Sequence, residues 1–359
     1  MKEKSAVTGV KEIARQAKVS IATVDRVIHN RPGVSEKTKT RINKIIAALN
    51  YQPNIFARQL ASRKNIEFAL LIPGVSTETN YWQAPLDGVL QAEKEINPLG
   101  ITVTRYFFSQ EDVGSFTKKA QAILKKKPAG VLLAPVFLPE SIDFLASCRS
   151  AGIPFVFIDA DIPEQGRLSY IGPDLFQSGC LAAHLIRFAI PNTAKVLVVN
   201  ISKDLDPSNP ADSQHRLSRK EAGIRFYFTA HKINNQLITI HLRNSDLASV
   251  SARLQAELTK YPEIQAICVT NSRVSRVAKF LEASKHQHIF LVGFDFTESN
   301  VHYLKKGVID FLICDKPREQ GYRGLMALYQ HVVLSLDVEP VYYMPIDIVT
   351  SENCTFYRN

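Results

Sequence analysis

Three polar residues each stand at the end of an apolar run, where their side chains could bind a ligand. Asp159 ends the run PFVFID, Asn271 ends AICVTN and Asp295 ends FLVGFD. Carboxylate and amide groups suit hydroxyl-rich ligands, because a hydroxyl group both donates and accepts hydrogen bonds. Taken singly, each residue could instead cap the helix that follows it. Three such residues after three separate runs favour a shared binding site.

The elements that must position these residues are strands and helices in alternation. Continuous apolar runs predict strands buried on both faces, and amphipathic segments between them predict helices. The predicted strands are Phe68–Ile72, Ile101–Phe107, Gly130–Ala134, Phe155–Ile158, Lys195–Asn200, Leu237–His241, Ala266–Thr270, Ile289–Val292 and Phe311–Ile313. The predicted helices include Leu175–Ala189, Lys220–Ala230 and Pro317–Ser335. One small open sheet does not hold this many strands. The alternation therefore predicts two lobes, each a doubly wound parallel sheet.

Sequence motifs for catalysis and metal binding are missing. The chain contains no GxxxxGK[ST], no GxGxxG after a strand, no GxSxG and no HExxH. Asp204 and Asp206 could be imagined as paired acids, but they stand in a polar loop. The five cysteines form no CxxC pair and do not have the spacing of metal ligands. We therefore expect each cysteine to be a small, buried hydrophobic residue of a protein in the reduced cytosol. We therefore predict no enzyme, no metal and no cofactor.

The positive charge of the chain is concentrated at one end. The net charge of the 359 residues is +10, and residues 1–64 alone hold 14 basic and 4 acidic residues. The remaining residues are neutral overall, so the distribution points to a polyanion bound by the N-terminal region. No apolar run reaches the roughly 18 residues of a membrane helix, and the N-terminus leads into no apolar signal core. We expect a cytoplasmic protein without membrane contact.

The basic N-terminal region is predicted to form a cluster of short helices, here called the head. Val10–Ala17 and Glu36–Leu49 have core-type spacing, and Ser20 and Ser35 are good N-caps for the second and third helices. The second helix lies in VSIATVDRVIHN, and its apolar residues do not all share one face. This arrangement is that of a helix-turn-helix, whose second helix enters the DNA major groove. A generic three-helix cap is the alternative.

Several motifs together identify the family that the chain resembles. They are Ala17-x-Val19-Ser20, Thr23-Val24-x-Arg26-Val27, Val34-Ser35-x-Lys37-Thr38, Leu49-Asn50-Tyr51-x-Pro53-Asn54 and Ala57-x-x-Leu60-Ala61. The stretch from Val10 to Ser62 closely resembles, without a gap, the DNA-binding head of the LacI/GalR family of bacterial repressors. With the strand and helix pattern behind it, the resemblance covers nearly the whole chain.

The resemblance implies roles for residues of the head. Ile21 and Ala22 occupy the positions that choose bases, where apolar side chains suit thymine methyl groups, and the Arg26 fork suits guanine. The residues Ser20, Thr23, Asn30 and Ser35 are expected at phosphates, which position the protein rather than specify the sequence. Pure capping is compatible with this role for the two cap serines. Asp25 and His29 depart from the usual Ser and Asn.

The segment NIFARQLA resembles the hinge helix of the family, which folds when it reaches the minor groove. Asn54 and Ala57 are expected to contact DNA there. Leu60 matches the leucine that is wedged between base pairs and kinks the duplex. The alternative for Leu60 is an ordinary linker residue.

The rest of the chain, here called the body, resembles the periplasmic-binding-protein fold that is the effector domain of the family. Ligand groups in such folds lie in the crevice at the carboxyl ends of strands. Asp159, Asn271 and Asp295 match effector positions, and Asp315 stands where many relatives have Gln. The effector-binding arginine of the family corresponds to Arg219 or Lys220. Arg273 is a further candidate, and so is Trp82, for which core packing is an equal alternative.

These observations predict a helix-turn-helix domain at residues 1–53, a hinge helix and linker at 54–65, and an effector-binding and dimerisation domain of two α/β lobes at 66–359. The expected function is that of a ligand-responsive transcriptional regulator, a repressor of carbohydrate-utilisation genes. As a homodimer it would bind a pseudo-palindromic operator in double-stranded DNA under the control of a sugar or sugar derivative. The alternative is a sugar sensor that acts through protein contacts and keeps a vestigial head.

Overall fold

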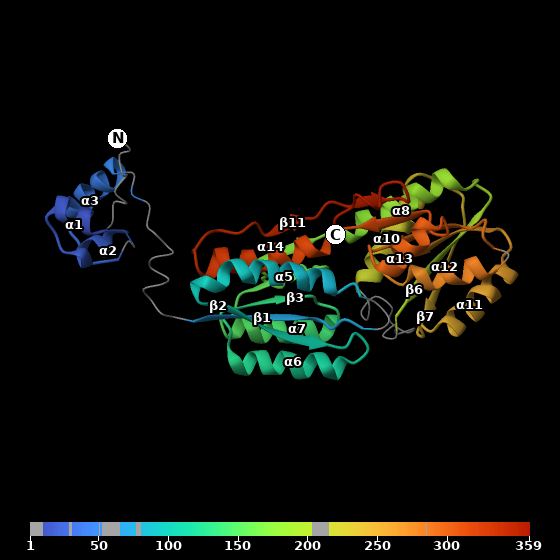
Figure 1. Cartoon of the computed structure of the whole chain (residues 1–359), viewed down its shortest axis with the longest axis horizontal. Coiled ribbons are helices and arrows are strands. Elements are labelled where there is room, and N and C mark those ends of the chain that lie inside the picture. The colour runs from blue at the N-terminus through green and yellow to red at the C-terminus, as the bar shows by residue number, and fades with distance from the viewer. Residues whose placement is uncertain are drawn as a thin grey trace. The chain divides into compact units, whose positions relative to one another are not determined.

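The computed structural model describes residues 10–28, 31–49, 51, 65–76, 80–202, 215–284 and 286–359. The chain divides into two compact units, Met1–Lys64 and Asn65–Asn359, which correspond to the head and the body (Figure 1). The predicted hinge segment lies outside the described residues. Within those residues, no helix has both the length and the apolar character needed to cross a membrane.

The head contains α1 (Val10–Ala17), α2 (Ile21–Ile28) and α3 (Glu36–Ala48). One side chain or more from each helix enters a common core, which includes Ile13, Val24 and Ile42. Lys18 turns the chain between α1 and α2 with a positive φ of 51°. The three predicted helices and their N-caps are therefore confirmed.

The first lobe of the body is a six-stranded parallel sheet with the order β11-β5-β4-β3-β1-β2. Its strands are β1 (Ile66–Pro73), β2 (Ile101–Phe108), β3 (Gly130–Leu133), β4 (Phe155–Ile158), β5 (Ser169–Gly172) and β11 (Val341–Tyr343). Its helices are α5 (Gln83–Ile96), α6 (Val113–Lys126), α7 (Leu138–Ser150) and α14 (Pro317–Val332), with the 3-10 turn η1 (Asn97–Leu99). Figure 1 shows α5 and α14 on one face of the sheet and α6 and α7 on the other.

The second lobe repeats this arrangement with the strand order β12-β10-β9-β8-β6-β7. Its strands are β6 (Lys195–Ile201), β7 (Leu237–Leu242), β8 (Ile264–Val269), β9 (Phe290–Phe294), β10 (Phe311–Cys314) and β12 (Asp347–Val349). Only β12 runs antiparallel to its neighbour. The helices α8 (Leu175–Ala189) and α10 (His215–Ala230) share one core, whereas α11 (Leu247–Lys260), α12 (Val274–Ala283) and α13 (Glu298–Lys305) share another on the opposite face.

Each lobe contains one pair of helices that cross at glycine. A Cβ atom on Gly88 of α5 would lie 1.8 Å from the carbonyl oxygen of Arg318 in α14, and one on Gly321 would lie 2.1 Å from that of Pro85. In the second lobe, a Cβ atom on Gly223 of α10 would lie 2.0 Å from the carbonyl oxygen of Phe176 in α8. Glycine is required at these positions because the two backbones touch.

The predicted α/β architecture with two parallel-sheet lobes and a helical head is confirmed, and all nine predicted strands are present. Three short strands (β5, β11 and β12) and α13 were not predicted. The helix α10 begins at His215 rather than at Lys220. The missed strands have three or four residues each, too few for a periodic pattern to be recognised.

The chain crosses between the lobes three times, after β5, after β10 and after β11. Each sheet is therefore built from segments that are distant in the sequence. Because of these crossings, residues that follow the carboxyl ends of β4, β9 and β10 come together between the lobes. The candidate site is formed there.

Candidate functional site

The exposed face of α2 is the candidate DNA-binding surface. Val24 and Val27 are buried in the head, whereas Ile21 is 51% exposed and Ala22 and Arg26 are also exposed. An exposed isoleucine beside an exposed arginine has no role in packing the head. The two faces inferred from the sequence are therefore present.

Both cap serines of the head make the hydrogen bonds expected of caps. The Ser20 Oγ accepts from the backbone N–H of Thr23 at 3.1 Å, and the Ser35 Oγ accepts from that of Thr38 at 3.4 Å. Thr23 also lies within hydrogen-bonding distance of Ser20 through its hydroxyl group, at 2.9 Å. These contacts fix the helix starts, and a phosphate contact by the same residues stays a prediction.

The unusual carboxylate of α2 has a partner beyond the helix. Asp25 forms an ion pair with Arg31, with 3.3 Å between the carboxylate Oδ2 and the guanidinium Nη1. The Arg26 side chain passes over Gly33, whose φ is +99°, and its Nη1 would lie 3.4 Å from a Cβ atom there. Asn30, Asn54, Ala57 and Leu60, together with His29, lie outside the described residues.

The buried carboxylate of Asp159 joins the two lobes. Its Oδ1 accepts a hydrogen bond from the Tyr81 hydroxyl at 2.9 Å, and its Oδ2 lies 2.8 Å from the Nε of Arg216. Asp159 and Tyr81 belong to the first lobe, whereas Arg216 belongs to α10 of the second. The guanidinium also lies 5.7 Å from the ring centroid of Trp82. This ion pair thus connects the lobes across the site.

A buried glutamine fixes the backbone beneath this ion pair. The Gln320 Oε1 accepts from the backbone N–H of Asp159 at 3.0 Å, and its Nε2 donates to the backbone carbonyl of Asp315 at 2.9 Å. Gln320 is fully buried near the start of α14. It therefore holds the end of β4 and the end of β10 at a constant separation.

Two further carboxylates come from the second lobe. Asp295 follows β9 and Asp315 follows β10, and both are buried. Burial raises the pKa of Asp295, although the Lys220 ammonium opposes this effect. Burial, and then the neighbouring Asp295 carboxylate, raise the pKa of Asp315 to about 7. The Lys220 Nζ lies 3.9 Å from the ring centroid of Phe294, so this cation is held among the acids.

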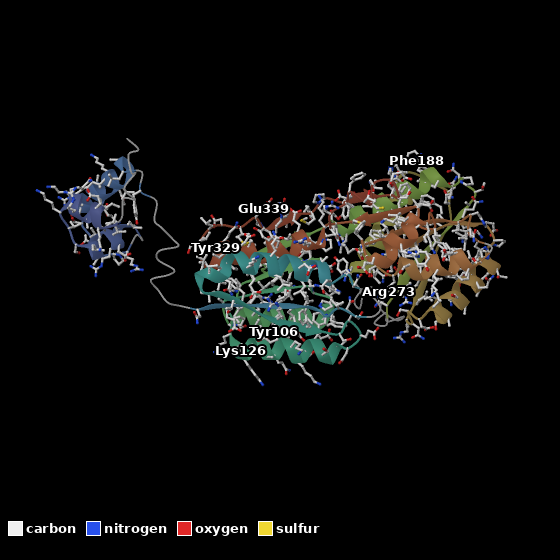
Figure 2. All side chains as sticks on the ribbon, in the orientation of Figure 1. Tyr106, Lys126, Phe188, Arg273, Tyr329 and Glu339 are labelled. Carbon is white, nitrogen blue, oxygen red and sulfur yellow. The ribbon has the colours of Figure 1, made fainter. Side chains whose placement is uncertain are left out.

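The edge of the second lobe contributes an amide and a second guanidinium. The Asn271 Nδ2 donates to the backbone carbonyl of Ile201 at 2.6 Å, and its Oδ1 accepts from the backbone N–H of Arg273 at 3.2 Å. The Arg273 Nη1 donates to the same carbonyl at 3.2 Å. Arg273 lies where the second lobe faces the first (Figure 2). Asn271 therefore shapes the turn after β8 and lines the space between the lobes, but it does not cap α12, whose N-cap position is occupied by Arg273.

The space between the lobes is a closed cleft. Its cavity has a volume of about 30 Å³, room for one or two water molecules. The lining comprises Tyr81, Trp82, Gln110, Glu111 and Val136 from the first lobe and Ser202, Arg216, Leu217, Asn271, Ser272 and Arg273 from the second. A sugar-sized ligand can enter only after the side chains or the lobes move apart.

The structure brings most of the predicted effector residues to this cleft. Those at or beneath it are Trp82, Asp159, Lys220, Asn271, Arg273, Asp295 and Asp315. Arg219 is different, because it is exposed, lies 5.4 Å from the ring of Phe176 and lines a separate cavity of about 190 Å³. Of the two alternatives for the basic residue, the structure therefore favours Lys220.

Two residues with central contacts were missed by the sequence analysis. They are Arg216, which pairs with Asp159, and Gln320, which bridges the strand ends. The position of Arg216 could have been found from the helical repeat, because residues four apart lie on one helix face and Lys220 is four residues further on. Gln320 carries no comparable signal, since its partners come from distant segments.

Comparison with known protein families divides the chain in the same way as the structure. Residues 9–54 match the family described as bacterial regulatory proteins, lacI family. Residues 68–333 match the family described as periplasmic binding protein domain. Catabolite control protein A of Staphylococcus aureus is 45% identical over 65 residues, which are 18% of this chain and 20% of the relative. The chain thus spans about a fifth of the length of the curated relatives that it matches.

Solved structures extend the likeness to the body. A candidate LacI transcriptional regulator of Bacteroides fragilis has a TM-score of 0.76 at 26% identity, over 82% of this chain and 100% of that one. GanP, a glucose-galactose binding protein of Geobacillus stearothermophilus, has a TM-score of 0.70 at 20% identity, over 81% and 99% of the two chains. The second likeness concerns the fold alone. The chain therefore belongs to the family of the periplasmic binding protein domain, which matches residues 68–333, and its head carries a domain of the lacI family of bacterial regulatory proteins, which matches residues 9–54.

Proposed function

We propose that the protein is a transcriptional repressor of carbohydrate-utilisation genes that binds a pseudo-palindromic operator as a homodimer. A sugar or sugar derivative in the interlobe cleft controls its affinity for DNA. The observation that carries this proposal is the Asp159–Arg216 ion pair, which joins the lobes at the place where ligand groups lie in such folds. The protein acts in the cytoplasm and associates with the nucleoid when it is bound to DNA.

The proposed mechanism follows from competition at Asp159. A hydroxylated effector offers donors to this carboxylate, which in the closed cleft are supplied by Tyr81 and Arg216. When the effector replaces Arg216, the lobes exchange one set of contacts for another, and their arrangement at the dimer interface changes. Linkage requires reciprocity, so operator DNA must change the affinity for the effector by the same factor.

The DNA-binding role is supported by the exposed face of α2 and by the charge of the head. Arg26→Ala is expected to weaken specific operator binding by roughly 1–3 kcal/mol, because the guanidinium fork reads guanine. Arg15→Ala is the matched control, because Arg15 is exposed on α1 and pairs with Glu12 within that helix. Binding of operator and random DNA would be measured by fluorescence anisotropy. An equal loss on both sequences would argue against base reading.

The segment 54–65 is proposed to be the hinge, with Asn54, Ala57 and Leu60 at the minor groove. Insertion of Leu60 between base pairs costs unstacking energy, which the additional contacts of a bent duplex offset. Leu60→Ala should therefore reduce the bend angle of operator DNA, as measured by energy transfer between dyes at its ends. An unchanged angle would refute the wedge.

The effector role is supported by the carboxylates of the cleft and by the described ligands of structural relatives, such as the glucose-galactose binding protein GanP. Asp295→Ala should abolish the response of DNA binding to the effector and leave DNA binding itself intact. A sugar library would first be screened by thermal shift on the full chain, since a ligand that binds the native state stabilises it. A normal effector response of the variant would exclude Asp295 from the site.

A second candidate function is a sugar sensor that acts through protein contacts with a vestigial head. The basic head argues against it. The two functions differ in salt dependence, because a DNA-binding protein that neutralises several phosphates loses affinity steeply between low and moderate salt. Weak and salt-independent binding to operator DNA would favour the sensor.

A further inference from the structure

The side chain of Asp315 is buried without a complete set of partners. It is 9% exposed, and its Oδ1 has no hydrogen-bond partner among the described residues. Its backbone is fixed by Gln320, so the carboxylate cannot leave the site by a small movement of the chain. A buried acceptor without a donor is costly, and it therefore marks a place where a donor from a ligand would be stabilised.

The charges around Asp315 do not balance. The carboxylates of Asp159 and Asp295 and the cations of Arg216 and Lys220 all act on it, which gives three acids against two bases. One further acid and one further base, Glu111 and Arg273, line the cavity beside the cluster. Counted over the described residues, the cluster around Asp315 therefore lacks one positive charge when every acid is ionised.

Within the described part of the chain, the other titratable groups near Asp315 do not supply this charge. They are Tyr81, Tyr170, Cys314, Asp347 and Tyr357. None of them becomes positive at any pH, and Asp347 has its own cation in Lys316, at 3.7 Å. In the absence of a ligand, a proton on the acid cluster fills the deficit, in agreement with the raised pKa of Asp315.

We propose that the effector is a hydroxylated molecule that carries a protonated amino group, and that Asp315 is the residue that selects this group. The inference rests on the proposed function of the cleft as the effector site. An ammonium group supplies both the missing donor and the missing charge. A neutral hydroxyl supplies only the donor, and an anionic group would add a fourth negative charge to the cluster.

The test compares matched ligands on the full-length protein. The probes are glucose and glucosamine, galactose and galactosamine, mannose and mannosamine, and sorbitol with its 1-amino-1-deoxy analogue. Glucuronate represents the anions. Binding would be detected by thermal shift and quantified by calorimetry at pH 6 and pH 8. The amine of the alditol remains protonated at both values, because its pKa resembles that of lysine.

The amine of at least one pair is expected to bind roughly ten times more tightly than its hydroxyl counterpart at pH 8, because a buried carboxylate gains more from a cation than from a neutral donor. The preference should shrink at pH 6, where Asp315 is protonated. Asp315→Asn should reduce the preference to within about threefold. Asp310→Asn is the matched control, because Asp310 precedes the opposite end of β10, where its Oδ2 accepts from the backbone N–H of Leu291 at 2.8 Å.

The possible results separate this inference from the proposed function. Equal or tighter binding of neutral sugars at both pH values would overturn the inference and leave the effector site in place, and so would a preference for glucuronate. An amine preference that survives in Asp315→Asn would remove the selecting role from this residue. Absence of binding by every probe would overturn both proposals. The pH dependence of the unmodified protein serves as the test if the variant does not fold.

Discussion

The two lobes place an aspartate at the same position but give it different partners. Asp159 follows β4 and Asp295 follows β9, and each of these strands is the third in the strand order of its sheet. Both have a left-handed backbone, with φ values of 72° and 73°. Asp159 is held by the Tyr81 hydroxyl and the Arg216 guanidinium, whereas burial raises the pKa of Asp295 in spite of Lys220. The repeated fold thus sets the positions of the acids, and each lobe surrounds its acid with different partners.

The strands next to these differ more strongly. In the first lobe β5 is followed by Pro173, whereas in the second lobe β10 is followed by Asp315. The second lobe therefore contributes two acids where the first contributes one. This difference teaches that the lobes are similar in architecture and unequal in chemistry. The first lobe offers an acid held in an ion pair, and the second offers a proton-binding cluster.

The largest expected effect comes from Asp159, the acid of the ion pair. Asp159→Ala leaves the Arg216 guanidinium without its carboxylate partner. The Arg216 side chain is only 16% exposed. The loss of one partner of a buried ion pair costs about 3–5 kcal/mol. Urea unfolding would be followed by the fluorescence of Trp82, the single tryptophan of the chain. A loss of less than about 1 kcal/mol in the free energy of unfolding would mean that the ion pair of Asp159 does not distinguish the first lobe from the second.

Substitutions at the glycines where two helices cross should instead show that the two lobes are alike in architecture. Gly88→Ala in the first lobe and Gly223→Ala in the second both force a Cβ atom into a backbone carbonyl of the facing helix. Each change should destabilise the body by about 3 kcal/mol through overpacking. Gly114→Ala on α6 is the control, because its nearest neighbour is the side chain of Asp112 at 3.1 Å. Unequal losses at the two crossings would break the architectural similarity.

The acid cluster of the second lobe predicts a pH dependence. The folded-state pKa of Asp315, about 7, exceeds the unfolded value of about 3.9, so the folded protein binds the proton more tightly. Stability is therefore highest below the unfolded pKa and falls as the pH rises through the folded pKa. The loss between pH 5 and pH 7 should be about 2 kcal/mol.

Asp315→Asn should remove most of this dependence, as measured by urea unfolding at several pH values. Asp159→Asn is the comparison in the first lobe, and it should reduce the slope less than Asp315→Asn does, because burial and Asp295 raise the pKa of Asp315 more than Asp159 does. If the free energy of unfolding of Asp315→Asn changed with pH as steeply as that of the unmodified protein, another group would be responsible for the titration.

The smallest expected effect concerns the donor to Asp159. Tyr81→Phe removes only the hydroxyl group that donates to the carboxylate at 2.9 Å. A hydrogen bond to a charged group contributes about 1.5 kcal/mol or somewhat more. Because Arg216 remains, the change should be smaller than that of Asp159→Ala, and the same fluorescence assay would compare the two. A larger effect for Tyr81→Phe would place the main support of Asp159 within the first lobe.

The sequence predicted those parts of the molecule that depend on local patterns. The buried strands and the acids after β4 and β9 could be found because a continuous apolar run ends at each of them. The short strands β5 and β11 could not be found in this way, because they are stabilised by pairing with each other. The same reason applies to Gln320, whose partners at the ends of β4 and β10 come from distant segments. Partners from distant segments leave no periodic signal in a single sequence.

The three crossings between the lobes have a consequence for the synthesis of the chain. Most of the first lobe is translated early, but its covering helix α14 and its edge strand β11 emerge only after β10 of the second lobe. Until then, Gly88 of α5 has no helix to pack against, and the apolar face beneath α14 is uncovered. The second lobe can thus complete its parallel strands on the ribosome while the first lobe waits for the last segments of the chain.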